Sequence, residues 1–212
     1  MKNNKECIID DILKERYNTL LDDYFHNIIT QSEIEETLDK LRNYYWPTYL
    51  HCVNVCRRII MIGILKDYSE TKIIEMGTAG ILLDVGYIEI PQNYLVKKTP
   101  LSKLEFEAIK KHPYFSQQIA MEIHLSDMVQ QYILNHHESG NGGYYQEQDS
   151  GVLSVEQSEI NIADKYEALL EKRPYREPMD HIKAIQTIYH MCSNSIEIAS
   201  LKTLLLTAKN FT

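Results

Sequence analysis

The sequence predicts an all-α protein, built as a helical bundle with an N-terminal helical extension. Apolar residues recur at spacings of three and four along most of the 212 positions, and no stretch shows the clean alternation of a strand. Only 8 glycines and 6 prolines interrupt the chain, too few for a β-rich fold. We expect a helical segment over residues 1–42 and a helical domain over residues 43–212.

Four helices are expected in the N-terminal part of the chain. Ser32 and Glu35 have the spacing of a capping box, which would open the second helix. Pro47 suits the first turn of the third helix, and the fourth is expected to end near Gly86. These helices span residues 7–27, 32–44, 47–62 and 71–83.

The remainder of the chain predicts further helices and two loops. Pro91 and Pro100 frame the first loop, and the polar, glycine-rich stretch 138–158 predicts the second. Ser102 and Glu105 repeat the capping spacing ahead of a helix that reaches His112. The later helices are expected over 116–124, 127–137, 159–171, 180–192 and 195–209.

Composition excludes several classes of protein. The net charge of −8 argues against a general nucleic-acid or membrane-surface binder. No apolar run approaches the roughly 20 residues of a membrane span, and the charged N-terminus does not resemble a signal peptide. The four cysteines lack zinc-type C-x-x-C spacing, which indicates reduced core residues in a cytoplasmic protein.

Six side chains in the middle of the chain are of the types that Fe, Mn or Zn bind. Two adjacent histidines followed by Glu138 and a glycine-rich turn are hard to explain by packing alone. The candidate metal ligands are His51, Asp84, His112, His136, His137 and Asp164.

Each candidate also has a structural explanation. His51 alone would be an ordinary core histidine, and Asp84 could end a helix in an Asx turn before a glycine. The doublet His136-His137 could interact with the carbonyls that end a helix, and Asp164 could be a solvated charge.

From about residue 43 to 190, the chain resembles a bacterial HD-GYP domain, a branch of the HD phosphohydrolase superfamily. The resemblance rests on the order of motifs that follow His51. These are L-D-V-G-Y (83–87), I-P-Q-N-Y-L-V-K (90–97), K-H-P (111–113), H-H-E-S-G-N-G-G-Y-Y (136–145), A-D-K-Y-E-A-L (163–169) and R-P-Y-R (173–176).

This resemblance implies a two-metal phosphodiesterase that acts on cyclic di-GMP or another nucleotide. Asp84 would bridge the two metals and is the expected catalytic residue. The first metal would be held by His51, position 83, Asp84 and Asp164, and the second by Asp84, His112, His136 and His137.

The chain departs from the family pattern at positions that the two-metal chemistry uses. Leu83 stands in place of a histidine ligand, and Tyr87 stands in place of a lysine near the scissile phosphate. Pro47 replaces the glutamate of members with a third metal, while Asn141 and Tyr145 alter the G-Y-P loop. These changes predict that at most one metal site is well occupied.

The chain also keeps residues that are candidates for binding the substrate. Lys97, Tyr144, Arg173 and Arg176 are expected to meet a nucleotide, although Arg173 and Arg176 could instead belong to a helix stop with packed stems. We expect a degenerate domain that binds a cyclic dinucleotide or a protein partner as a regulatory module. The alternatives are an active metal-dependent phosphohydrolase and an interaction domain without metal.

Overall fold

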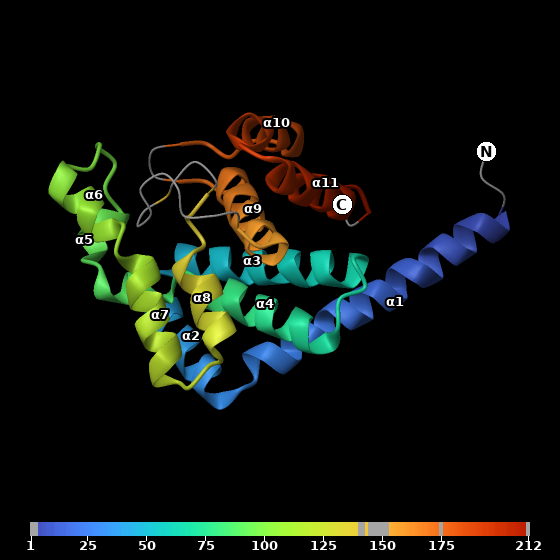
Figure 1. Cartoon of the computed structure of the whole chain (residues 1–212), viewed down its shortest axis with the longest axis horizontal. Coiled ribbons are helices and arrows are strands. Elements are labelled where there is room, and N and C mark those ends of the chain that lie inside the picture. Colours follow the sequence, from blue (N-terminus) through green and yellow to red (C-terminus); the bar gives the residue numbers. More distant parts are fainter. Residues whose placement is uncertain (1–3, 140–142, 144–152, 174–175, 211–212) are drawn as a thin grey trace.

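The computed structural model describes residues 4–139, 143, 153–173 and 176–210, and their secondary structure confirms an all-α fold (Figure 1). Within these residues no strand forms, apart from a single isolated bridge between Arg173 and Arg176. The helices are α1 (Asn4–Ile29), α2 (Ser32–Tyr44), α3 (Trp46–Leu65), α4 (Glu70–Leu82), η1 (Val85–Glu89, a 3-10 helix), α5 (Gln92–Leu95), α6 (Lys103–Ile109), α7 (His112–Glu122), α8 (Asp127–Leu134), α9 (Val155–Leu170), α10 (His181–Met191) and α11 (Ser195–Asn210).

Helix α3 lies at the centre of the bundle. It packs against α1, α2 and α4 on one side and against α9 and α11 on the other (Figure 1). Cys56, Ile59 and Ile62 on this helix are fully buried. His51, near the start of the helix, is only 1% exposed. The core helix therefore carries a polar ligand candidate into the interior of the bundle.

The N-terminal segment shares the core of the main domain. Leu21 and Ile28 of α1, and Ile34 and Leu41 of α2, belong to the same buried cluster as the residues of α3. The first half of α1 extends away from the bundle (Figure 1). The boundary between residues 42 and 43 stays a prediction.

The second helix starts at the expected residue but lacks the expected cap. Helix α2 begins at Ser32, but its cap residue is Gln31, and the hydroxyl of Ser32 bonds to Glu33 instead of capping the helix. By contrast, Ser102 and Glu105 form the expected capping box of α6. A capping spacing therefore predicts a helix start without proving which residue caps it.

Four helix boundaries near the ligand candidates were predicted wrongly, and the first is the end of α6, which lies at Ile109 rather than at His112. Helix α7 begins at His112 rather than at residue 116, because Pro113 fits its first turn. Helix α9 begins at Val155 rather than at residue 159, with Ser154 accepting a hydrogen bond from the Gln157 amide. Helix α8 ends at Leu134, so the predicted extension to residue 137 is absent.

The expectation that no apolar stretch approaches the length of a membrane span was wrong for α3. An 18-residue window of this 20-residue helix has a mean hydropathy of 1.3, which meets the length and composition of a spanning helix. Of that window, 56% is buried inside the bundle, and a central core helix has the same composition.

Candidate metal centre and adjoining pocket

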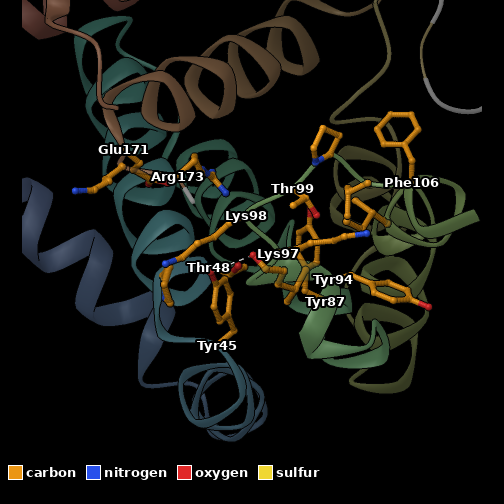
Figure 2. A pocket seen from close by; sticks show the side chains of 16 residues that line it. Tyr45, Thr48, Tyr87, Tyr94, Lys97, Lys98, Thr99, Phe106, Glu171 and Arg173 are labelled. Atoms are coloured by element: carbon orange, nitrogen blue, oxygen red, sulfur yellow. Dashed lines mark hydrogen bonds and ion pairs between the residues drawn. The ribbon is translucent and has the colours of Figure 1, made fainter. Parts of the chain in front are cut away.

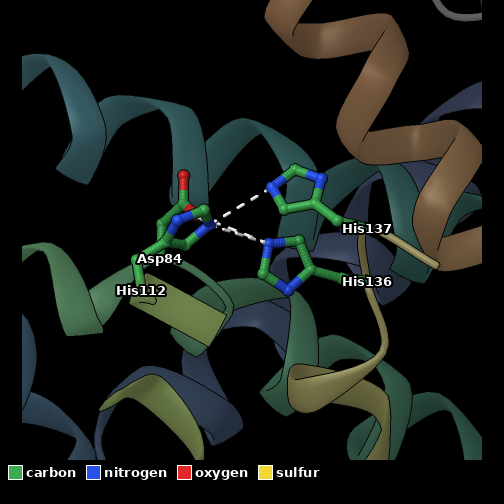
Figure 3. A group of neighbouring side chains, drawn as sticks. All are labelled: Asp84, His112, His136 and His137. Carbon is green, nitrogen blue, oxygen red and sulfur yellow. Dashed lines mark hydrogen bonds and ion pairs between the residues drawn. The ribbon is translucent and has the colours of Figure 1, made fainter. Parts of the chain in front are cut away.

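Four candidate ligands converge between helices. Donor atoms of Asp84, His112, His136 and His137 all lie within 4.8 Å of one another (Figure 3). Asp84 precedes η1, His112 is the first residue of α7, and the two histidines lie in the turn after α8. Three segments far apart in sequence thus meet at one point.

A glycine brings two of these segments together. A Cβ atom at Gly86 would lie 2.3 Å from the His112 carbonyl oxygen and 2.5 Å from the Ser116 nitrogen. The Gly86 amide donates a hydrogen bond of 2.8 Å to the hydroxyl of Ser116. Because η1 rests directly on the backbone of α7, Asp84 is held against His112.

The hydrogen bonds of the histidines point their lone pairs at one another. The Nδ1 atoms of His112 and His136 lie 2.8 and 2.6 Å from the carbonyl oxygens of Ile109 and Ile133 and donate to them. In a neutral ring, Nε2 then carries a lone pair, and these two Nε2 atoms are 3.2 Å apart. Such facing lone pairs fit a divalent cation.

The third imidazole and the carboxylate complete this arrangement. His137 Nε2 lies 3.2 Å from His112 Nε2, and Asp84 Oδ1 lies 3.0 Å from the same nitrogen. Three imidazoles and one carboxylate are a donor set suited to Fe, Mn or Zn. The residues present therefore fit the predicted second metal.

The electrostatics of the cluster favour the ligand forms of two side chains. Burial opposes ionisation of Asp84, but the neighbouring histidines, His112 first, outweigh it and hold the pKa of this carboxyl well below 3.8. Burial and the charge of His136 push the pKa of His137 well below 6.5. A metal needs an ionised carboxylate and a neutral imidazole.

The ligands expected at the first metal lie beside this cluster. His51 Nε2 is 2.9 Å from Asp164 Oδ1 and 3.7 Å from Asp84 Oδ2. Burial alone would lower the pKa of His51, but hydrogen bonds to Asp164 and Glu171 outweigh burial and raise it to about 10. Leu83 is fully buried in the hydrophobic core and has no donor atom to offer.

Glu171 is a functional candidate that the sequence analysis missed. Its Oε1 lies 3.0 Å from His51 Nδ1, and its Oε2 lies 3.0 Å from Arg173 Nη2. A carboxylate just after a helix, two residues before the R-P-Y-R motif, was the available signal, but it matched no ligand pattern. The structure shows that this carboxylate fixes the outer nitrogen of His51.

A pocket of about 1010 Å³ adjoins the cluster, because Tyr87 lines the pocket and also stacks on His112. Figure 2 shows the side chains that line the pocket. Its walls come from the start of α3, from Tyr87, from residues 94–109 and from residues 171–173. Four cationic side chains line it, together with aromatic rings. The cations are Lys97, Lys98, Lys172 and Arg173, and the rings are Tyr45, Tyr87, Tyr94 and Phe106.

The residues expected to contact substrate lie in different places. Lys97 lines the pocket and pairs with Glu105 at 2.6 Å. Arg173 also lines it, whereas Arg176 donates to the carbonyl oxygen of Ala168 near the end of α9. Tyr144, like the substituted loop positions 141 and 145, lies outside the described residues. These four assignments remain predictions.

Comparison with curated proteins finds phosphodiesterases of cyclic dinucleotides. A cyclic di-GMP phosphodiesterase from Pseudomonas aeruginosa is 27% identical over 173 residues, covering 79% of this chain and 41% of that protein. The cyclic di-GMP phosphodiesterase PdeB of Borreliella burgdorferi is 30% identical over 128 residues, 60% of this chain and 34% of its own length. The chain therefore spans less than half of either relative.

Solved structures share the fold. The HD domain of the L. monocytogenes phosphodiesterase PgpH, in complex with cyclic-di-AMP, aligns with a TM-score of 0.61 at 17% identity. The alignment covers 83% of this chain and 97% of that one. An HDG"Y"P protein from Bdellovibrio bacteriovorus gives a TM-score of 0.62 at 19% identity, over 92% of this chain and 64% of that chain.

A family model matches the part of the chain that forms the bundle and its ligand cluster. The family model described as "HD domain" matches residues 47–197, from the start of α3 into α11. This match covers most of the chain and includes all six ligand candidates. It confirms the HD-type assignment made from the motifs, and the chain belongs to the HD domain family.

Proposed function

We propose that this HD domain binds a cyclic dinucleotide, with cyclic di-GMP as the first candidate, and hydrolyses it poorly or not at all. One observation carries the proposal: the second ligand set is assembled beside a cationic pocket, while Leu83 leaves the first set without a donor. The domain would then act as a nucleotide-binding regulatory module.

The metal content follows from the ligands. Asp84, His112, His136 and His137 would hold one Fe, Mn or Zn ion, and His51 and Asp164 alone would hold little more. A divalent ion held by these residues would supply a Lewis acid for a phosphate oxygen and would lower the pKa of a bound water. Two ions working together would require the donor that Leu83 lacks.

The pocket supports a phosphorylated, aromatic ligand. Lys98 and Arg173 lie on its walls and can neutralise phosphate charge, and Tyr45 and Tyr94 offer faces for a nucleobase. Relatives named as phosphodiesterases for cyclic di-GMP support that ligand over other nucleotides.

The test combines metal analysis with two measurements on cyclic di-GMP. We expect no more than one equivalent of Fe, Mn or Zn per chain, measurable equilibrium binding of cyclic di-GMP, and turnover far below that of an intact family member. Two or more equivalents of metal, or robust metal-dependent turnover, would contradict the proposal. Absence of binding would contradict the assigned ligand.

A working phosphodiesterase is the second candidate. The completeness of the second ligand set favours it, because a single ion can still activate water and polarise a phosphate. Sustained turnover that disappears in His112→Ala and in protein stripped of metal would establish this candidate in place of the first.

A further inference from the structure

We propose that Tyr87 and Glu171 form a partition between the pocket and the ligand cluster, so that a phosphoester bound in the pocket does not reach a metal held by the cluster. This inference rests on the proposed function, because it supposes a nucleotide in the pocket. It identifies the two residues that separate nucleotide binding from metal chemistry.

The composition of the pocket wall is the first observation. None of the six ligand candidates is among the residues that line the pocket in the described part of the chain. Tyr87 and Glu171 do line it, and each also contacts a ligand candidate. The pocket and the cluster are therefore neighbours that share a wall made of these side chains.

Tyr87 covers one histidine of the cluster. Its ring stacks on His112 with centroids 4.3 Å apart and planes inclined by 13°. His112 is only 1% exposed, so the tyrosine covers a ring that is otherwise enclosed by protein. The Tyr87 amide donates to the Asp84 carbonyl at 3.0 Å, which means that the turn positioning Asp84 also positions the partition.

Glu171 gives the second half of the wall a negative charge. One carboxylate oxygen contacts His51 and the other contacts Arg173, each at 3.0 Å. Arg173 lines the pocket, so a phosphate bound by Arg173 would have the Glu171 carboxylate between it and His51. Repulsion between the two anions therefore favours a phosphate that stays on the pocket side.

Independent binding of metal and nucleotide follows from this arrangement. If no phosphate oxygen reaches the metal, the two ligands have no direct contact through which to alter each other's affinity. Removing the Tyr87 ring would open a route from the pocket to the cluster. A phosphate oxygen could then bind the metal, and the affinities would become coupled.

The experiment measures equilibrium binding of cyclic di-GMP to metal-free and Mn²⁺-loaded protein. For the wild type we expect dissociation constants that agree within about twofold, whereas Mn²⁺ should tighten binding to Tyr87→Ala by about tenfold or more. Tyr94→Ala is the matched control, because Tyr94 is a second tyrosine that lines the same pocket, while Tyr87 is the tyrosine that stacks on His112. It should change affinity equally with and without Mn²⁺.

The possible outcomes test the partition and the proposed function separately. Wild-type binding that already strengthens tenfold with Mn²⁺, or Tyr87→Ala binding that ignores Mn²⁺, would overturn the partition. If the wild type binds no nucleotide in either state, the proposed function fails. Mn²⁺-dependent binding by Tyr87→Ala would still support the partition in that case, and no binding by this variant would refute both.

Discussion

Leu83 sits one residue before Asp84 and is fully buried. A histidine there would lie next to the carboxylate that faces both His51 and His112. Leucine and histidine have similar volumes, so the exchange is sterically mild. The surroundings are apolar, however, and the new imidazole would lack a partner to fix its orientation.

We therefore expect Leu83→His to raise the metal content from about one toward about two ions per chain, with a smaller effect on cyclic di-GMP hydrolysis. Elemental analysis of purified protein is the measurement. Leu82→His is the control, since it places the same polar group in the core one position away. Unchanged metal content in Leu83→His would mean that the first ligand set is not built as inferred.

His51 gives the metal-free protein a distinctive pH dependence. Its pKa rises from 6.5 to about 10 on folding, so its contribution to stability is complete below pH 6.5 and declines as pH rises through 10. Over the range of about pH 7 to 9, the free energy of unfolding should fall by on the order of 1 kcal/mol per pH unit.

Chemical denaturation of chelator-treated protein across this range checks the expectation. His51→Gln removes the titrating group and should flatten the profile. A profile of equal slope in the wild type and the variant would assign the dependence to other groups.

The sequence identified six ligand candidates by residue type and order, and the structure brings four of them into one cluster with the other two beside it. It did not identify Glu171, because a single carboxylate after a helix resembles any solvated charge. It also could not show that Tyr87 lies flat on His112, since stacking depends on how η1 meets α7.

At the scale of the elements, the close contact between η1 and α7 depends on Gly86, which has no side chain. A Cβ at Gly86 would clash with backbone atoms of His112 and Ser116, which cannot move without shifting α7. We expect Gly86→Ala to lower stability by roughly 1–3 kcal/mol and to weaken metal binding, because it displaces His112 from Asp84.

Gly63→Ala supplies the matched comparison. Its Cβ would meet the side chain of Ile73 at 2.8 Å, in the contact between α3 and α4 rather than at the cluster. Thermal unfolding and metal titration should show destabilisation in both variants and reduced metal affinity only in Gly86→Ala. Normal metal affinity in Gly86→Ala would show that this contact does not position the ligand.

Helical periodicity predicted most elements, but their ends depended on local chemistry. Helix α8 ends before the His136-His137 doublet, since the His136 ring bonds the carbonyl of Ile133 within the final turn. Ser154 caps α9 inside a stretch whose polar, glycine-rich composition predicted a loop. A periodic pattern therefore locates a helix better than it locates the residue at which the helix stops.

At the scale of the whole molecule, charge is unevenly distributed. The chain carries a net charge of −8, yet four cations line one pocket. Local cations attract an anionic ligand over short range, while the acidic remainder repels it at low ionic strength. The pocket cations should dominate once the ligand is bound.

The affinity for cyclic di-GMP should therefore fall by several-fold to about tenfold as NaCl rises from about 0.05 to about 0.5 M. Lys98→Gln should reduce this salt dependence, because Lys98 lines the pocket. Lys40→Gln should not, since Lys40 pairs with Glu36 on the exposed face of α2. Equilibrium titrations at several salt concentrations distinguish these results, and equal slopes for both variants would place the ligand elsewhere.

The meeting of Asp84, His112 and His136 also has a topological consequence. His112 and His136 are 24 residues apart in sequence, so an ion that joins them closes a loop of chain, and its bond to Asp84 closes another. Such a cross-link lowers the entropy of the unfolded chain much as a disulfide does. Closure entropy grows only with the logarithm of loop length, so a short loop closed by a single ion is stabilised nearly as much as a loop of twice its length.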